Sequence, residues 1–211
     1  MSSPFPPRPG PVHISALLTP ALLAAAVPSF AQQPADVSAW ALGPSVAFVH
    51  FSAAGSSGEG AEAGFAPAVG AGIAVERSIG PLALLLAIEQ LTTRIQVRDD
   101  FVTIEPQAPA VDRTRLGLSL RTTLARASGA RVILDAGPTL DIWSPDGSAS
   151  RSSAGATARL AVETHAGPVT VENALGFGLS KGPLDEEDLP EGYDRSTMRT
   201  ITITIAAKFG L

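Results

Sequence analysis

The sequence predicts an all-β protein: an eight-stranded antiparallel up-and-down transmembrane β-barrel behind an N-terminal export signal. Three observations predict it. An apolar leader precedes a small-residue cleavage site, apolar and polar residues alternate along eight later segments, and the connections between those segments alternate between long and short. The leader bears on export, and the other two observations bear on the barrel.

Residues 1–31 have the three parts of a secretory signal peptide. Arg8 is its only charged residue, an apolar stretch runs from Ile14 to Val27, and small residues precede a cut after Ala31. A membrane anchor is less favoured, because about 14 apolar residues fall short of the roughly 20 that a spanning helix needs. We therefore expect 32–37 to be a short periplasmic lead and 38–211 to be the barrel domain.

The composition after the leader narrows the functional classes. Loss of Arg8 moves the formal net charge from −5 to −6, which argues against a nucleic-acid partner. The chain has no cysteine, so disulfides, thiolate metal sites and a lipoprotein anchor are excluded. No stretch after the leader reaches roughly 18 consecutive apolar residues, so a membrane could be crossed only by a closed barrel.

Period-two alternation marks the strands, because successive side chains of a strand point to opposite faces. It is clearest near the end of the chain, where Ile201 to Ile205 alternate with Thr200 to Thr204. The segment near 81–97 is ambiguous, since its leucine-rich start also suits a helix. The eight predicted strands lie near 38–51, 63–78, 81–97, 115–124, 131–142, 159–163, 169–178 and 200–211.

The connections alternate in length. The tight ones contain glycine and suit hairpin turns; they lie at 78–81, 127–130 and 165–168. The long ones are polar and lie at about 52–62, 98–112, 144–153 and 180–195. In an up-and-down barrel the long loops then share one rim, while both chain ends lie with the tight turns. Outer-membrane barrels are built this way.

The polar faces of the strands carry nearly balanced charges. We expect them to face a narrow lumen, because buried charges are costly unless they are paired. The candidates for lumenal ion pairs are Glu76, Glu89, Arg115, Arg121, Arg131, Asp135, Asp141, Arg159, Glu163, Glu172 and Lys208. The opposite orientation, with an apolar lumen, describes a soluble periplasmic barrel that binds an apolar ligand. It stays an alternative.

Aromatic residues fall near both rims of the predicted strands. Rings at the two membrane interfaces form girdles in outer-membrane barrels. The girdle candidates are Trp40 and Phe209 at the periplasmic rim, and Phe51, Phe65, Trp143 and Phe177 at the opposite rim.

The mature chain resembles the small eight-stranded outer-membrane barrels of the OmpA/OmpX type in strand number and loop order. Its last strand, with Ile203, Ile205, Phe209 and Leu211 at alternating positions, resembles the C-terminal signal of that class, although the final residue is usually aromatic. The resemblance implies a bacterial outer-membrane location, lipid and lipopolysaccharide as neighbours, insertion by the barrel-insertion machinery, and a monomer. Fold alone gives no activity.

Few residues suggest chemistry. His50 lies near the outer end of the first strand with Ser52 two residues on, but no catalytic motif surrounds it, and His165 lies at a tight turn. The acidic run 184–191 could bind a divalent cation, but a solvated loop is the simpler interpretation. Gly58, Gly60 and Gly64 precede no strand–helix unit that would make a phosphate loop. We expect no catalytic residues, metal or cofactor.

These patterns favour a non-enzymatic outer-membrane protein with a filled lumen, in an envelope-structural role or a role mediated by its loops. Eight strands enclose a space that side chains fill, which excludes a wide pore and leaves only a narrow ion path open. The alternatives are an outer-membrane lipid-modifying hydrolase, as some barrels of this class are, and the soluble ligand-binding barrel.

Overall fold

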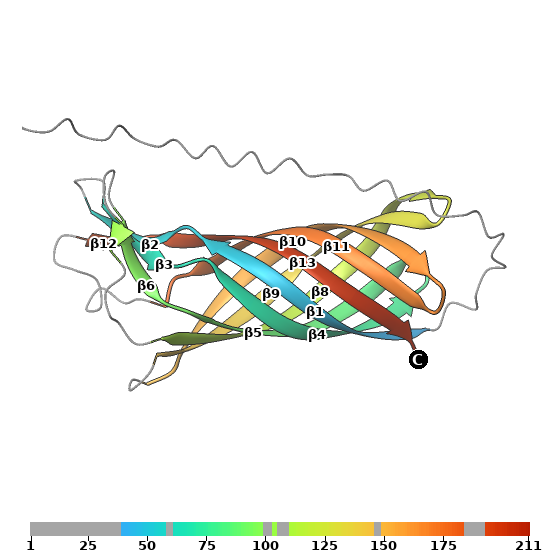
Figure 1. Cartoon of the computed structure of the whole chain (residues 1–211), viewed down its shortest axis with the longest axis horizontal. Helices are drawn as coiled ribbons and strands as arrows, with labels where there is room; N and C mark the ends of the chain where they lie inside the picture. The colour runs from blue at the N-terminus through green and yellow to red at the C-terminus, as the bar shows by residue number, and fades with distance from the viewer. Residues whose placement is uncertain (1–38, 58–60, 99–102, 105–109, 146–148, 184–192) are drawn as a thin grey trace, which may run out of the picture. The chain divides into compact units, whose positions relative to one another are not determined.

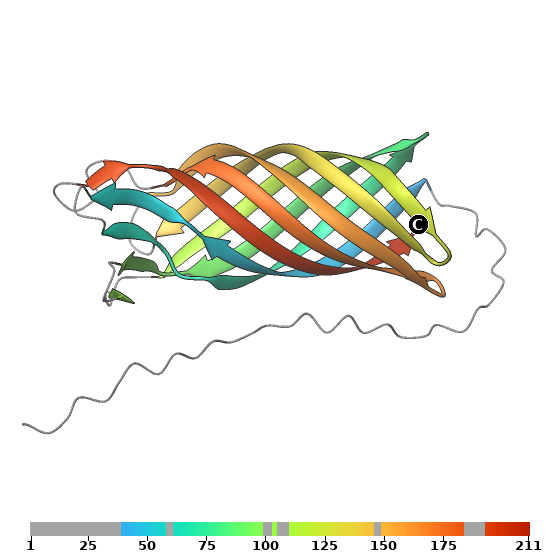
Figure 2. The ribbon, with the colours of Figure 1, turned by 90° about the horizontal axis from the view of Figure 1, so that it is seen from above.

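The computed structural model describes residues 39–57, 61–98, 103–104, 110–145, 149–183 and 193–211. Eight long strands close into one antiparallel barrel (Figures 1 and 2), which confirms the predicted all-β fold. In chain order they are β1 (Trp40–Phe51), β4 (Ala68–Ile79), β5 (Leu82–Thr93), β8 (Val111–Ala127), β9 (Ala130–Pro145), β10 (Arg151–Ala166), β11 (Val169–Lys181) and β13 (Thr197–Gly210). Each pairs with its neighbours in the chain, and β13 closes the barrel against β1.

Residues 1–31 and 32–37, predicted as signal peptide and periplasmic lead, lie outside the described residues. Within the part that the structure describes, no helix is long and apolar enough to span a membrane.

The segment near 81–97 is a strand, so the helical alternative is wrong. In β5, Leu84 and Leu86 are exposed while Ala83 and Leu85 are buried, which is the two-residue period of a strand. Pairing with β4 and β8 on either side satisfies its backbone and overrides the helical preference of leucine.

The tight turns lie where the sequence predicts them. In two of them the first central residue, Gly80 or Gly167, has φ of 60° or 64° and is followed by proline. A positive φ at this position is typical of the type II′ hairpin, whose twist matches that of the flanking strands. The third turn has Gly129, with φ of 76°, as its second central residue.

Three of the four long connections are not simple loops. They contain the short strands β2 (Ala53–Ser57), β3 (Glu62–Phe65), β6 (Ile95–Arg98), β7 (Thr103–Ile104) and β12 (Tyr193–Arg195). These form a second sheet in the order β12-β2-β3-β6-β7, which we call the rim sheet. It lies at the end of the barrel away from the tight turns (Figure 1). Glycine, alanine and serine dilute its periodicity, which hides these strands in the sequence.

The apolar face points outward. The six residues most diagnostic of orientation are Leu116, Leu118, Leu134, Leu140, Ile201 and Ile203, and all are 37–54% exposed. They belong to a belt of exposed aliphatic side chains around the barrel, while charged side chains occupy the inside. A soluble barrel with an apolar interior is thereby contradicted. The arrangement is that of a barrel whose outer face contacts lipid.

Half of the predicted aromatic girdle is wrong. Trp40, Phe177 and Phe209 are 44–47% exposed on the outer face, as a girdle requires, but three rings predicted at the outer rim are almost fully buried. These are Phe51, Phe65 and Trp143. The prediction placed them by height along the strand and not by face: Phe48 and His50 point outward, so the next residue, Phe51, points into the lumen.

Candidate functional site: a filled lumen and an outer recess

Eight charged side chains from six barrel strands meet in the half of the lumen near the tight turns. We call them the inner charge network, and its members are Glu76, Arg121, Arg131, Asp135, Arg159, Glu163, Glu172 and Lys208. All belong to the predicted lumenal set. Four are cations and four are anions, so the network has no formal net charge.

Arg121 on β8 lies at the centre of the inner charge network. Its Nη1 donates to Glu76 at 2.8 Å and to Glu172 at 2.7 Å. The same nitrogen donates to Glu163 at 3.1 Å, and Nη2 donates to Asp135 at 3.0 Å. Its side chain is only 2% exposed. One guanidinium therefore joins carboxylates from four other strands across the lumen.

Lys208 on β13 gives the network a second centre. Its Nζ lies 2.7 Å from Glu76, and 2.6 Å from both Glu163 and Glu172. The remaining hydrogen-bonded pairs join Arg131 to Glu163 and Arg159 to Asp135. Each carboxylate thus has at least two cationic partners, the condition under which buried charge is tolerated.

Further along the lumen lie two more hydrogen-bonded ion pairs. Arg115 donates to Asp141 at 2.7 and 2.9 Å, and Arg113 donates to Glu89. Arg113 is missing from the predicted set, although its side chain is fully buried. The predicted strand begins at Arg115, whereas β8 begins four residues earlier, at Val111. Arg113 has the same parity as Arg115, so a longer strand would have included it.

Beyond these pairs, the three misplaced rings pack together inside the barrel. Phe65 stacks on Trp143 with ring centroids 4.7 Å apart, and Phe51 meets them at 5.8 and 6.0 Å. The guanidinium of Arg113 lies 5.3 Å from the ring of Phe51 and 5.8 Å from that of Trp143. Aliphatic side chains, including Met198, pack against the rings. We call this group the aromatic cluster.

The space left in the lumen is divided. A pocket of about 60 Å³ lies mid-lumen, lined in part by Glu89, Arg115 and Arg159. A larger one of about 560 Å³ opens among the tight turns, lined in part by Arg121 and Arg131. Members of the inner charge network line both and stand between them.

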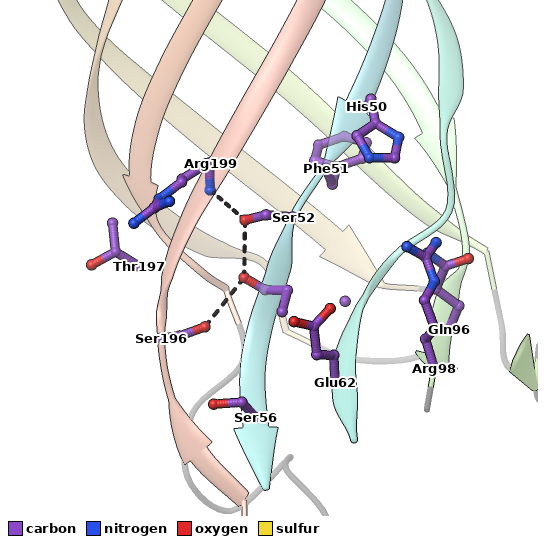
Figure 3. Close-up of a pocket in the computed structure, with 12 residues that line it drawn as sticks. His50, Phe51, Ser52, Ser56, Glu62, Gln96, Arg98, Ser196, Thr197 and Arg199 are labelled. Carbon is purple, nitrogen blue, oxygen red and sulfur yellow. Dashed lines mark hydrogen bonds between the residues drawn. The ribbon is translucent and has the colours of Figure 1, made fainter. Parts of the chain in front are cut away.

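A third cavity lies outside the barrel wall, in the outer face of the rim sheet (Figure 3). This outer recess has a volume of about 620 Å³. Its lining is mostly polar and comprises His50, Phe51, Ser52, Ala53, Ser56, Glu62, Gly64, Gln96, Arg98, Ser196, Thr197 and Arg199. As candidates for chemistry the sequence indicates His50 and Ser52 of this set; it singles out Phe51 and Gly64 for other roles, and the remaining residues lie in the predicted loops or at the end of a strand.

The outer recess brings His50, Ser52 and Glu62 together without forming a catalytic triad. The Ser52 hydroxyl accepts from the backbone N–H of Arg199 at 2.8 Å and donates to the carbonyl of Ala53 at 3.3 Å. Figure 3 shows it pointing toward Arg199 and away from the imidazole. A serine nucleophile needs a base within hydrogen-bond reach, and these contacts direct Ser52 elsewhere.

The other chemistry candidates are placed more simply. His165 is exposed, and its Nδ1 lies 2.9 Å from the hydroxyl of Thr170 beside a tight turn. Gly64 lies in β3 opposite Gln96, so it belongs to a strand. Gly58, Gly60 and the acidic run 184–191 lie outside the described residues.

The predicted insertion signal lies on the lipid-facing side of β13. Ile203, Ile205, Phe209 and Leu211 are 44–72% exposed. The backbone N–H of Leu211 donates to the carbonyl of Trp40 at 3.0 Å, at the seam between β13 and β1.

Comparison with known proteins identifies the fold. No family model and no curated protein matches the sequence. Neisserial surface protein A (NspA) matches the structure with a TM-score of 0.60 at 15% identity, over 82% of this chain and 98% of that chain. Ail, the attachment invasion locus protein of Yersinia pestis, matches at 12% identity and a TM-score of 0.37, over 82% and 97% of the two chains. At these identities only the fold of NspA bears on this chain.

The chain therefore has the fold of the small eight-stranded outer-membrane barrels, as its OmpA/OmpX-type resemblance implies. A closed barrel with an exposed apolar belt and a polar, ion-paired lumen belongs in an outer membrane, where lipid surrounds the belt.

Proposed function

We propose that this protein is a non-enzymatic, non-conducting barrel that contributes to envelope structure and presents its outer rim to partners outside the cell. The observation that carries the proposal is the filled lumen. The inner charge network crosses one half of it and the aromatic cluster occupies the other, and eight strands leave little space beyond what side chains fill.

Conductance across a planar lipid bilayer tests the sealed lumen. We expect no current steps from the purified wild-type protein, because an ion would have to displace Arg121 from four carboxylates. Replacing Arg121, Lys208 and Trp143 together by alanine weakens both the inner charge network and the aromatic cluster and should produce small cation-selective steps, since four buried carboxylates then lack their central partners. Reproducible steps from the wild type would contradict the proposal. The matched control is Arg77→Ala, an exposed arginine on the outer face.

The rim sheet supports the second half of the proposal. It continues the barrel wall past the apolar belt, and the connections that contain it lie on the side opposite the tight turns. Exposed aliphatic side chains occur on all eight barrel strands, so lipid can surround the whole barrel, as in a monomer. We expect the barrel-insertion machinery to deliver it to the membrane. Light scattering in detergent checks the mass.

A lipid-modifying hydrolase is the second candidate, because the outer recess places His50, Ser52 and Glu62 in one cavity near the membrane. Replacing His50 by alanine and comparing lipid A and phospholipid profiles of cells separates the two. We expect unchanged profiles from the variant and from a deletion strain. A profile that changes in both would support the hydrolase and remove the non-enzymatic proposal.

A further inference from the structure

Two arginines of the outer recess have no carboxylate partner among the residues that the structure describes. Arg98 on β6 and Arg199 on β13 are exposed, and within the described part of the chain no carboxylate lies within 4.0 Å of either guanidinium. Glu62 stands directly opposite Arg98 in the β3–β6 ladder and yet forms no ion pair with it. The arginines of the inner charge network, in contrast, are all paired. The charge of Arg98 and Arg199 is therefore available to a ligand.

The outer recess lies at the upper boundary of the apolar belt. His50 follows Trp40 by ten residues of β1, and Arg199 precedes Phe209 by ten residues of β13. Ten residues of a strand tilted by about 40° rise about 25 Å along the barrel axis, which is the height of the lipid-facing band. Trp40 and Phe209 lie at its lower boundary, so His50 and Arg199 lie where the acyl chains end.

The same boundary appears in the residue types. On the outer face of β1, Val46 and Phe48 are followed by His50, and on β13, Ile203 and Ile201 give way to Arg199. His50 is the cross-strand partner of Ile201, and Arg199 follows two residues further toward the rim, so the changes on these adjacent strands lie within two residues of each other in the ladder. A molecule seated in the outer recess is therefore level with the head groups of the outer leaflet.

The outer recess is shaped for more than a bare anion. Figure 3 shows Arg199 on one side and Arg98 on the other, with Ser52 and Glu62 between them. Its volume of about 620 Å³ lies within the range of about 300–1,000 Å³ that is typical of small-molecule sites. Hydroxyl and amide groups of Ser56, Gln96 and Thr197 complete a polar lining.

We propose that the outer recess binds the phosphorylated sugar head group of an outer-leaflet lipid, with Arg98 and Arg199 holding its phosphate groups from the two sides of the recess. Guanidinium groups bind phosphate through paired N–H donors. The hydroxyl and amide groups of the recess suit the hydroxyls of a sugar. The acyl chains of such a lipid would lie down the exposed apolar face of β1 and β13, directly below the recess.

Glu62 lets the direction of a change in lipid affinity distinguish direct binding of phosphate from binding through a cation. Its carboxylate lines the same recess and repels a phosphate, so it weakens direct binding by the arginines. Removing this charge should strengthen the binding. If a divalent cation bridged Glu62 to the phosphate instead, removing the charge would weaken it.

Native mass spectrometry of the full barrel in detergent tests the site, with bisphosphorylated lipid A as the probe and its dephosphorylated form as the comparison. We expect a one-to-one adduct with the phosphorylated lipid that persists in EDTA. The dephosphorylated lipid should bind at least tenfold more weakly, and so should Arg98→Ala/Arg199→Ala with the phosphorylated lipid. Glu62→Gln should bind it a few-fold more tightly. The control Arg77→Ala, on the outer face of β4 close to a tight turn, should bind as the wild type does.

Three results would overturn the assignment: equal binding of the double variant, equal binding of the dephosphorylated lipid, or loss of the adduct in EDTA. Displacement by equimolar inorganic phosphate would show a site for free phosphate and would also remove the lipid assignment. Heat-modifiable migration on gels verifies that each variant is folded. The outcome is independent of conductance, so this inference and the proposed sealed lumen can fail separately.

Discussion

The two halves of the lumen are filled by different chemistry. The half near the tight turns holds the inner charge network, whose members are satisfied only by particular partners at particular distances. The half near the rim sheet holds the aromatic cluster, whose contacts are apolar and less directional. The difference shows that the lumen of one barrel can be filled in two ways: by ion pairs that fix the positions of the strands, and by aromatic rings that occupy the volume.

The largest effect should follow from breaking the inner charge network at its centre. Arg121→Leu leaves Glu76, Asp135, Glu163 and Glu172 with one fewer cation among them in a buried site. Removing one partner of a buried ion pair costs about 3–5 kcal/mol, and we expect a loss of about 4 kcal/mol in the free energy of unfolding. Urea-induced unfolding in lipid vesicles measures it.

The control for this variant is Arg126→Leu, which removes an exposed arginine from the same strand. Its loss should stay within about 0.5 kcal/mol, as is usual for surface substitutions. Equal losses from the two variants would mean that the ion pairs of Arg121 contribute nothing beyond general charge.

A smaller loss should follow from opening the aromatic cluster. Trp143→Ala removes the ring that stacks on Phe65 and receives Arg113, and truncations of this kind cost about 3–5 kcal/mol. We expect about 3 kcal/mol, because the lost contacts are apolar and no buried charge loses its ion-pair partner. The same unfolding assay measures it, with the lipid-facing Phe177→Ala as the control.

The expected order of the two losses in the free energy of unfolding would be reversed if Trp143→Ala lost more than Arg121→Leu. In that case the apolar filling, rather than the ion pairs, would be the main stabiliser of the barrel. A loss from Phe177→Ala as large as that from Trp143→Ala would show that burial inside the lumen has no special weight.

The sequence predicts the barrel strands and the lumenal charges because both follow from one local rule, the alternation of faces. That rule places Glu163 and Lys208 inside without any knowledge of pairing. It places Phe51 inside as well, and also Arg113 once its strand is extended to begin at Val111. Their misassignment came from where the strands were thought to begin and end, and from placing rings by height.

Other features depend on contacts that no local pattern contains. Arg121 meets Glu172 across the lumen, 51 residues away and on a strand that is not its neighbour. The outer recess gathers residues from β1, β2, β3, β6 and β13, and the middle three of these strands are short and weakly periodic. Such groupings follow from register and closure, which only the folded barrel shows.

The seam between β1 and β13 sets the order in which the protein can form. The other barrel ladders join strands that are neighbours along the barrel meander, and three of them are hairpins that closure of a tight turn can start. The seam joins Ala41 to Gly210 and Phe51 to Thr200, across nearly the whole described chain. Until β13 arrives, β1 keeps an open edge of unpaired N–H and C=O groups, which lipid cannot satisfy and which invites aggregation in water. The barrel can therefore close only when its last strand is in place, and until then the edge of β1 stays open to pairing with other chains.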